Sequence, residues 1–233
     1  MMKLRKSEER GHADHGWLNS YHTFSFANYH DPEQMGYRSL RVINDDRVAP
    51  GRGFGAHAHR DMEILTYVLD GQLAHKDSMG HTELLGPNEI QKMSAGSGVV
   101  HSEFNGSASE PVHFLQIWIE PQSRGTAPNY EQYAFQPEEK RNRFRLLASN
   151  ETVAGAARLN QDAKVSVAEV TSGNTVTYAL GERRHAWVHV VDGDVRLNGE
   201  ALTTGDAVAV DEERELSFTA NSGKAEVLVF DLA

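Results

Sequence analysis

The sequence predicts an all-β protein made of two antiparallel β-barrel halves, and three observations lead to this fold class. Short apolar or alternating runs recur along the chain, for example over residues 63–69, 113–119 and 226–230. Gly, Asp and Asn separate these runs at short spacing, which is typical of antiparallel sandwiches and barrels. Periodicity of the long-helix kind is scarce, so we expect strands to supply the hydrophobic cores.

A weak internal repeat divides the chain into two halves. Residues 67–73 (YVLDGQL) are echoed by residues 189–195 (HVVDGDV), and residues 87–90 are paralleled by residues 204–207. In both copies an Asp-Gly pair lies between apolar runs, and these residues tolerate the positive φ angles of a type I′ hairpin turn. The matching hairpins favour a duplicated barrel unit over coincidence.

Length and composition limit the architecture and the chemistry. The 233 residues suit two small domains. We expect domains over 1–125 and 151–233, and between them a charged, proline-bracketed connection over 126–150 with at most one short helix. With no cysteine, the chain excludes disulfides, thiolate-bound zinc, iron–sulfur clusters and thiol nucleophiles. Any metal must be held by nitrogen and oxygen donors, so the twelve histidines are the first candidates.

Charge and hydropathy exclude several kinds of partner. The net charge of −10 argues against general affinity for nucleic acid or anionic membranes. No run of about 18 apolar residues could span a membrane, and no apolar signal region follows the charged N-terminus. We expect a soluble, cytoplasmic protein without direct nucleic-acid or membrane binding, and we expect a monomer.

Two short motifs place histidines and a carboxylate on strand faces. One residue separates His57 from His59, and one residue separates His101 from Glu103. On a strand this spacing points both side chains to the same face, as a shared metal requires. If the two strands face each other across a barrel, three imidazoles and one carboxylate converge. Such a set leaves two positions of an octahedral ion open, which indicates a catalytic rather than a structural site.

The internal repeat allows a comparison between the halves. Offsets from the shared turns place Ala179, Gly181, Phe218 and Ala220 at the positions that correspond to the four candidates. None of these side chains can bind a metal, so we expect one ion per chain. Affinity for that ion is expected to fall below about pH 6, because a protonated imidazole cannot be a ligand.

The same residues carry a family resemblance. Residues 51–71 (G-x5-H-x-H-x3-E, followed by Gly71) resemble the first cupin motif, and residues 96–105 (G-x-G-x2-H-x3-N) resemble the second, with glycine where many cupins have proline. A fuller resemblance, to the pirin family, covers nearly the whole chain and includes bacterial pirin-like quercetin 2,3-dioxygenases. Its segments are 16–18 (GWL), 22–26 (HTFSF), 57–63 (HAHRDME), 75–80 (HKDSMG) and 94–103 (SAGSGVVHSE).

The resemblance implies a bicupin, with two packed jelly-roll barrels and non-haem iron in the N-terminal one. Carried over by motif, the ligands are His57, His59, His101 and Glu103, around one Fe²⁺, with Mn, Co, Ni, Cu or Zn as alternatives. Most metal-binding cupins instead use the carboxylate of the first motif, here Glu63, so both carboxylates stay open. We expect Glu103 to be the ligand and Glu63 to orient a histidine N–H from behind.

The resemblance also implies an activity. In a quercetin 2,3-dioxygenase, dioxygen opens the ring of a planar flavonol and carbon monoxide is released. Glu103 would be the catalytic base that accepts the proton of the flavonol 3-hydroxyl. An alternative, similar to some pirins, is a metal- or redox-sensing regulator that binds a protein partner without catalysis. A metal-dependent isomerase or a cupin binding module is a third, because ligands alone do not name a reaction.

Further side chains have both a functional and a structural interpretation. A second metal site at His12 and His15 is less favoured than a solvated N-terminal segment. His75 and Asp77 share a strand face, either at the mouth of the pocket or on the polar outside of the barrel. Arg60 is either near the metal or an ordinary surface residue. Four aromatic residues are expected in the barrel core rather than around a flat substrate: Phe24, Phe26, Phe54 and Trp118.

Overall fold

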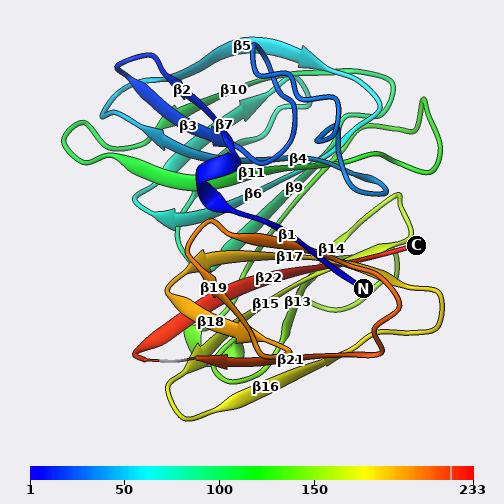
Figure 1. The fold of residues 1–233 in the computed structure, drawn as a ribbon. Coiled ribbons are helices and arrows are strands. Elements are labelled where there is room, and N and C mark those ends of the chain that lie inside the picture. The colour runs from blue at the N-terminus through cyan, green and yellow to red at the C-terminus, as the bar shows by residue number, and fades with distance from the viewer. Residues whose placement is uncertain (221) are drawn as a thin grey trace. The chain divides into compact units, whose positions relative to one another are not determined.

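The computed structural model describes residues 1–220 and 222–233 and confirms the all-β fold class (Figure 1). The chain forms two compact units, and each contains a larger and a smaller antiparallel sheet. The N-terminal unit comprises Gly11–Phe135 and Glu151–Gln161. The C-terminal unit comprises Met1–Arg10, Gln136–Asn150 and Asp162–Ala233.

The N-terminal unit is built on two sheets. Its larger sheet has the order β12-β9-β6-β11-β4-β3-β2, and its smaller sheet has the order β5-β10-β7-β8. In chain order the strands are β2 (Gly11–Asp14), β3 (Leu18–His22), β4 (Leu40–Val48), β5 (Gly53–His59), β6 (Glu63–Asp70), β7 (Leu73–Asp77), β8 (Thr82–Leu85), β9 (Glu89–Ser94), β10 (Val99–Asn105), β11 (Val112–Ile119), β12 (Asn129–Ala134) and the two-residue β14 (Ala157–Arg158).

The C-terminal unit repeats this plan. Its larger sheet has the order β1-β20-β17-β22-β15-β13, and its smaller sheet has the order β16-β21-β18-β19. Its elements are β1 (Met2–Arg5), η1 (Ser7–Glu9), η2 (Pro137–Glu139), β13 (Arg145–Ser149), β15 (Ala163–Thr171), β16 (Thr175–Ala179), β17 (His185–Asp192), β18 (Asp194–Leu197), β19 (Glu200–Thr203), β20 (Ala207–Val210), β21 (Glu215–Ala220) and β22 (Lys224–Leu232).

The shared strand order confirms the predicted duplication. The order β5-β10-β7-β8 has its counterpart in β16-β21-β18-β19, and β9-β6-β11-β4-β3 has its counterpart in β20-β17-β22-β15-β13. The edge strand next to β9 or β20 differs in origin. β12 follows the N-terminal barrel in the chain, whereas β1 is the first strand of the chain and pairs with β20. In Figure 1 the blue β1 therefore lies among the orange and red strands.

Three segments belong to other units than the predicted ranges 1–125, 126–150 and 151–233 imply. Met1–Arg10 belongs to the C-terminal unit, because β1 completes the edge of its larger sheet. The expected connection contains β12, which pairs with β9, and β13, which pairs with β15. Glu151–Gln161 returns to the N-terminal unit. Periodicity shows that a segment is a strand but does not show which sheet it joins, so these exchanges left no local signal.

The two Asp-Gly turns of the repeat depend on glycine for a physical reason. Gly71 and Gly193 have φ angles of 78° and 79°, and neither aspartate has a positive φ angle, so the predicted type I′ turn is not formed. A Cβ atom on Gly71 would lie 2.6 Å from the carbonyl oxygen of Pro111, and one on Gly193 would lie 2.2 Å from that of Lys224. Both glycines therefore allow a left-handed backbone and a close approach to a neighbouring strand.

The two barrel interiors differ in composition. One cluster of buried apolar residues fills the C-terminal unit, and it includes Val176, Val195 and Phe218. Among the described residues, the N-terminal unit includes smaller clusters around Phe114 and around Met93. Polar side chains occupy many of the remaining inner positions of the N-terminal unit. That difference places the candidate site in the N-terminal unit.

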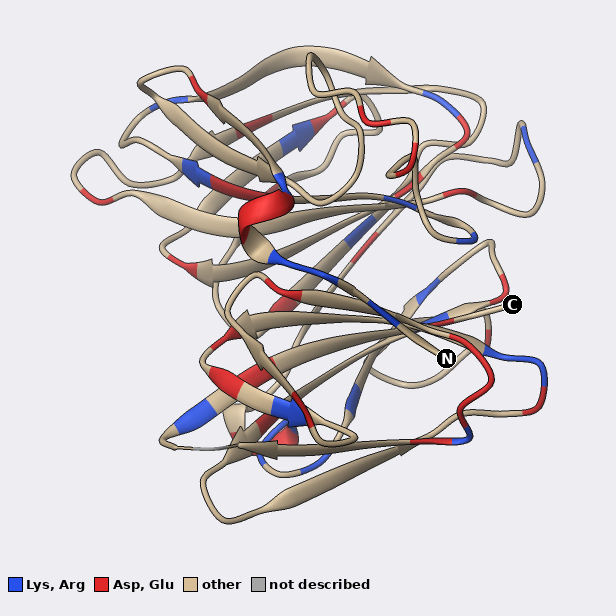
Figure 2. Ribbon diagram, in the orientation of Figure 1, with Lys and Arg blue, Asp and Glu red and all other residues tan. Residues whose placement is uncertain are grey.

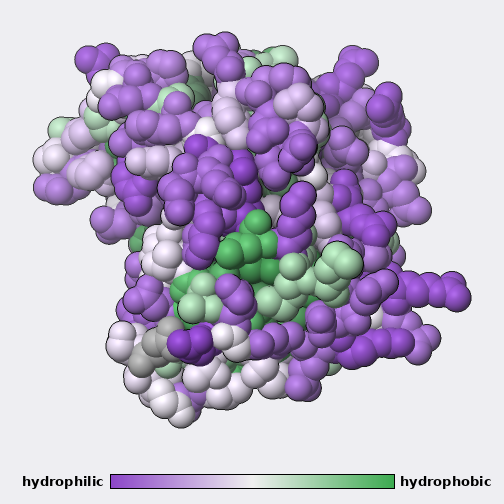
Figure 3. All heavy atoms as spheres, in the orientation of Figure 1, coloured by the Kyte–Doolittle hydropathy of each residue, from purple (hydrophilic) through white to green (hydrophobic). Residues whose placement is uncertain are grey.

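The surface shows charges of both signs in each unit, interspersed along strands and loops (Figure 2). On the face drawn in Figure 3, hydrophilic residues predominate, and hydrophobic residues gather in one area over the C-terminal unit. In the part of the chain that the structure describes, no helix has the length and hydropathy needed to cross a membrane.

Candidate metal centre

The candidate histidines lie on two neighbouring strands of the smaller sheet. β5 and β10 are hydrogen-bonded and antiparallel, with His57 opposite His101 and His59 opposite Val99. The expectation that these strands face each other across the barrel is therefore wrong. The side chains nevertheless converge, because residues two apart on a strand share one face and cross-strand pairs lie about 5 Å apart.

A β-bulge sets the position of the fourth candidate. The ladder shifts between His101 and Glu103, so that Glu103 lies opposite Phe54. β5 thus has one more residue than β10 over this stretch, which defines a bulge. Gly55 lies in the bulged stretch, and its carbonyl oxygen accepts a hydrogen bond of 2.8 Å from His57 Nδ1. With the proton on Nδ1, the Nε2 atom of His57 keeps a free lone pair.

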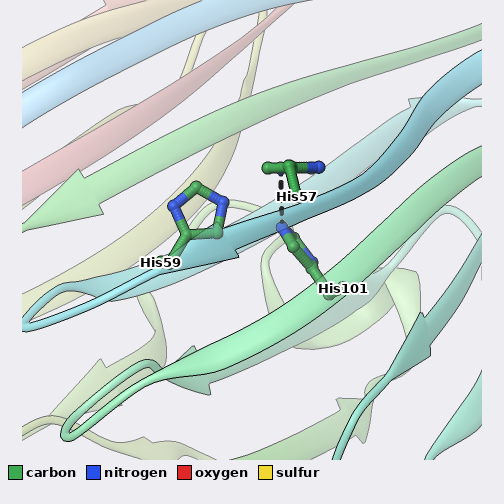
Figure 4. A group of neighbouring side chains, drawn as sticks. All are labelled: His57, His59 and His101. Carbon is green, nitrogen blue, oxygen red and sulfur yellow. Dashed lines mark hydrogen bonds between the residues drawn. The ribbon is translucent and has the colours of Figure 1, made fainter.

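The three imidazole rings point toward one another (Figure 4). Ring centroids are 4.5 Å apart for His57 and His101 and 4.8 Å apart from His59 to each of the other two. The Nε2 atoms of His57 and His101 are 3.0 Å apart. Two nitrogens that bind one ion at about 2.1 Å lie about 3 Å apart when their bonds meet at right angles. The observed spacing therefore fits a shared metal ion.

Burial holds two of these imidazoles in the neutral form. His101 is 2% exposed, and burial, with His57 as the next cause, lowers its pKa to about 3. Burial and His57 likewise lower the pKa of His59 to about 4. The His59 ring also contacts Trp118 edge to face, with centroids 5.0 Å apart. At neutral pH both rings are therefore in the form that a metal binds.

Glu103 adds a buried carboxyl group beside the histidines. It is 2% exposed, and burial raises its pKa to about 7. One carboxylate oxygen accepts a hydrogen bond of 2.9 Å from Gln116 Nε2, and the other accepts one of 3.4 Å from Thr66 Oγ1. Both donors are neutral. A carboxylate in this environment gains most from a nearby cation, so the donor set suits a divalent metal.

Glu63 does not have the predicted role. It is 1% exposed, but its carboxylate accepts hydrogen bonds from Ser94 Oγ at 2.9 Å and from the backbone N and the Nδ2 of Asn160, both at 3.2 Å. Within the described residues, none of its hydrogen bonds goes to a histidine. The expectation that Glu63 orients an imidazole is wrong, and the residue instead ties Glu151–Gln161 to β6 and β9.

His75 and Asp77 lie in the barrel interior. The two predicted alternatives, the mouth of the pocket and the polar outside of the barrel, are both wrong. They are 1% and 8% exposed and are absent from the lining of the cavity described below. His75 Nε2 donates to Asp77 Oδ2 at 3.1 Å, and His81 Nδ1 donates to the same oxygen at 3.0 Å. Among residues 1–220 and 222–233 there are two groups of possible metal donors, each with its atoms within 4.8 Å of one another. They are His57, His59 and His101, and His75, His101 and Glu103.

A cavity of about 440 Å³ opens beside these side chains, and its lining lies wholly within the N-terminal unit. His57, His59 and Glu103 line one part of it. Small-molecule sites commonly have volumes of roughly 300–1,000 Å³. The candidate donors therefore border a space that a small organic molecule can enter.

Other residues around the cavity correct several expectations. Phe26, Phe54 and Trp118 line the cavity, whereas Phe24 is buried in the core. His12 and His15 are exposed, as expected for a solvated segment, but they also line the cavity. The pairing of β2 with β3 brings them there, and this contact has no signal in the local sequence. Arg60 is exposed and is not part of the lining.

Sequence reasoning missed the polar wall of the cavity. Five buried polar residues line it: Ser20, His22, Asn44, Asp46 and Gln116. Burial raises the pKa of Asp46 to about 7, and the charges of Asp45 and Glu103 act in the same direction. A usable signal did exist, because polar residues at inner positions of an otherwise apolar strand are costly unless they have partners.

Fold and site together define a class of protein. Two of the three candidate imidazoles and Glu103 border a cavity in one cupin barrel, and His101 lies beside them, while the described residues of the other barrel contain no such donor group. The protein is a bicupin with one candidate metal centre. Family models agree with this: the pirin model matches residues 3–119, and the model of the quercetinase C-terminal cupin domain matches residues 146–232. The chain belongs to the pirin family.

Individual relatives are similar over their full length. A quercetin 2,3-dioxygenase of Escherichia coli K12 is 46% identical over 232 residues, which is 100% of this chain and 99% of the relative. A putative quercetin 2,3-dioxygenase of Pseudomonas aeruginosa is 42% identical, with 100% of both chains covered. The crystal structure of the bacterial pirin YhhW from Escherichia coli in complex with nickel(II) is 45% identical, has a TM-score of 0.94 and covers 100% of this chain and 99% of that chain.

Proposed function

We propose that this protein is a metal-dependent dioxygenase that opens the flavonol ring of quercetin or of a similar planar aromatic compound. The observation that carries the proposal is the cavity of about 440 Å³, which His57, His59 and Glu103 line together with four aromatic side chains. The quercetin 2,3-dioxygenase of Escherichia coli to which this chain is similar and the nickel(II) in the YhhW structure support it. Iron(II) is the ion that we propose for the cell.

The proposed ligands are His57, His59, His101 and Glu103. Two features favour this set over the alternative group that includes His75. His57 and His59 line the cavity, whereas His75 does not. His75 Nε2 is already bonded to Asp77, which leaves only its Nδ1 atom as a donor. An ion held by the proposed set therefore borders the space where a substrate binds.

The chain's own residues divide the chemistry among them. A divalent ion bound here supplies Lewis acidity, which lowers the pKa of a phenolic hydroxyl and favours its ionised form. Glu103 would accept the proton of the flavonol 3-hydroxyl on a carboxylate oxygen that is not bound to the ion. Gln116 keeps the carboxyl group in place during the transfer. Phe26, Phe54 and Trp118 exclude water and hold the aromatic rings.

Oxygen uptake tests this proposal. Protein loaded in turn with Fe, Mn, Co, Ni and Cu is mixed with quercetin in air, and dioxygen consumption and carbon monoxide release are recorded. At least one loaded form should turn over faster than the free metal. Glu103→Gln should abolish turnover, and metal content is measured alongside, because the neutral amide also weakens metal binding. Glu63→Gln is the matched control, since its carboxylate is buried but bonded to Ser94 and Asn160.

Absence of oxygen uptake in every fully loaded form would exclude the dioxygenase for this substrate. A protein partner recovered only with the metal-loaded form would then favour the regulator alternative. Turnover by Glu103→Gln at full metal occupancy would leave the dioxygenase standing and would remove Glu103 as the base.

A further inference from the structure

A row of buried polar side chains crosses four strands of the larger sheet in the N-terminal unit. In register, Thr66 on β6 lies opposite Gln116 on β11, Gln116 lies opposite Asn44 on β4, and Asn44 lies opposite His22 on β3. Their exposed fractions run from 1% to 8%. Because neighbouring strands are about 4.8 Å apart, the row extends roughly 10 Å from Gln116 to β3.

Most groups in this row form hydrogen bonds with one another or with Glu103. Gln116 and Thr66 donate to Glu103 at the metal end of the row. At the other end, His22 Nδ1 donates to Asn44 Oδ1 at 2.9 Å. These contacts hold the wall in one arrangement without any ligand. The row therefore connects the candidate metal centre to a second polar area of the same cavity.

Asp46 is the exception in this second area. It lies on β4 next to the row, opposite Ser20 on β3 and opposite Phe114 on β11. It is 4% exposed and lines the cavity, and no group in the described structure forms a hydrogen bond with its Oδ1 atom. A buried polar atom without a hydrogen-bond partner destabilises the folded protein. A protein can retain such a destabilising group where a bound ligand supplies the missing hydrogen bond.

The neighbouring aspartate shows that this is a property of the cavity rather than of the strand. Asp45 points to the other face of β4 and accepts hydrogen bonds from Arg47 and His113 at 3.0 and 2.7 Å. It is 7% exposed but is not part of the cavity lining. Two adjacent carboxyl groups with similar burial thus differ: Oδ1 of Asp45 has two hydrogen-bond partners, whereas Oδ1 of Asp46 has none in the described structure.

We propose that Asp46 is a specificity-determining residue, whose Oδ1 atom accepts a hydrogen bond from a hydroxyl on the pendant ring of a polyhydroxylated planar aromatic substrate. This inference rests on the proposed function, which places the reacting 3-hydroxyl at the Glu103 end of the cavity. Asp46 lies one strand beyond Gln116, so a group that pairs with it belongs to a part of the ligand away from the metal. Phe26, Phe54 and Trp118 accept the flat ring system between these two polar ends.

Anaerobic binding measurements test this inference without turnover. The probes are quercetin and the flavonol that is identical except for the absence of both pendant-ring hydroxyls. Affinity of each for the metal-loaded protein is measured by calorimetry or by quenching of tryptophan fluorescence. Wild type should prefer quercetin by about tenfold or more, because the other flavonol leaves Asp46 unpaired. Asp46→Leu should lose that preference, and Asp46→Asn should reduce it.

Two controls separate recognition from damage to the fold. Asp45→Asn should keep the wild-type preference, since its carboxyl group faces away from the cavity. Asp46→Leu should raise the melting temperature, because it replaces a buried carboxyl group, whose Oδ1 atom lacks a partner, with an apolar side chain. A lowered melting temperature would contradict the claim that Asp46 is costly to the unliganded protein.

The outcomes distinguish this inference from the proposed function. If Asp46→Leu changes the affinity of both flavonols by the same factor, or of neither, Asp46 does not recognise the pendant ring, whatever the oxygen uptake. If the preference depends on Asp46 but no loaded form consumes oxygen, the recognition site stands and the dioxygenase proposal fails.

Discussion

The two barrels have the same strand order but differ in the polarity of the side chains that fill them. In the smaller sheet of the N-terminal unit, His101 pairs with His57 and Asp77, and Glu103 pairs with His75. The equivalent ladder of the C-terminal unit has apolar residues at all of these positions. The corresponding pairs are His57 and Val176, Asp77 and Leu197, His75 and Val195, His101 and Phe218, and Glu103 and Ala220.

The larger sheets show the same contrast. Counted from the shared Asp-Gly turn, Thr66 corresponds to Val188, which pairs with Val229 where the N-terminal unit has Gln116. Val188 and Val229 are fully buried and belong to one continuous apolar cluster. The same backbone therefore supports either a packed core or a polar cavity. The comparison teaches that these inner positions can be polar in both sheets without a change of fold. The second copy has apolar packing at the positions where the first has polar and candidate metal-binding side chains.

Replacing the metal donors should have the largest effect on this contrast. In the His57→Ala/His101→Ala double variant we expect complete loss of the tightly bound ion, because two of four proposed ligands are gone. Elemental analysis of the purified protein measures metal per chain. His30→Ala is the control, since His30 is exposed and outside the cavity lining, and it should retain one ion. Full loading of the double variant, or two ions in wild type, would contradict a single centre.

Removing a core residue from the other barrel should give the opposite pattern. Phe218 is fully buried in the apolar cluster, so Phe218→Ala should lower the free energy of unfolding by about 3–5 kcal/mol through lost burial and a cavity. Metal content per folded chain should not change. Phe104→Ala on β10 is the control, because Phe104 is 41% exposed and should cost far less. A Phe218 variant that folds normally but binds no metal would show that the second barrel contributes to the site.

The pH dependence of metal affinity should begin at a higher pH than the sequence suggested, and it should come from Glu103 rather than from the imidazoles of His59 and His101. His59 and His101 have pKa values lowered to about 4 and about 3, so their protons compete with the metal only at strongly acidic pH. Glu103, with a pKa of about 7 in the metal-free protein, must lose a proton below that pH when the ion binds. Affinity should therefore fall by about tenfold per pH unit below 7.

Chelator competition between pH 5 and pH 8 measures this slope. In Glu103→Gln the affinity should be lower at every pH but less dependent on pH, since the competing proton is absent. An equal slope in both proteins would assign the pH dependence to another group.

Much of the fold was predictable because short runs of apolar or alternating residues, separated by turn residues, recur along the chain. The runs over residues 63–69, 113–119 and 226–230 all lie in strands β6, β11 and β22. The repeat correctly paired His101 with Phe218 and Glu103 with Ala220. It misplaced the other pair, because the ladder sets Val176 and not Ala179 opposite Phe218. Counting back from the shared turn fails here, because Asp70 follows His57 by 13 positions (70 − 57), whereas Asp192 follows Val176 by 16 (192 − 176).

The surroundings of the candidate site were less predictable than its donors. The donors form an H-x-H and an H-x-E pair, each local in sequence. The hydrogen-bond partners of Glu63 and Glu103 are distant in sequence. Asn160, for example, lies 97 residues from Glu63. The cavity wall at Asp46 depends on β3, β4 and β11 coming together, and only tertiary structure brings these strands into register. Local patterns therefore identify donors, whereas the sheet register decides what surrounds them.

A crystal structure of the metal-loaded protein, with anomalous scattering recorded at the edge of the bound metal, tests the central claim most directly. We predict one anomalous peak per chain, within bonding distance of His57, His59, His101 and Glu103, and no peak near Phe218. A peak bound by His75, or a second peak within the C-terminal barrel, would contradict the proposed centre.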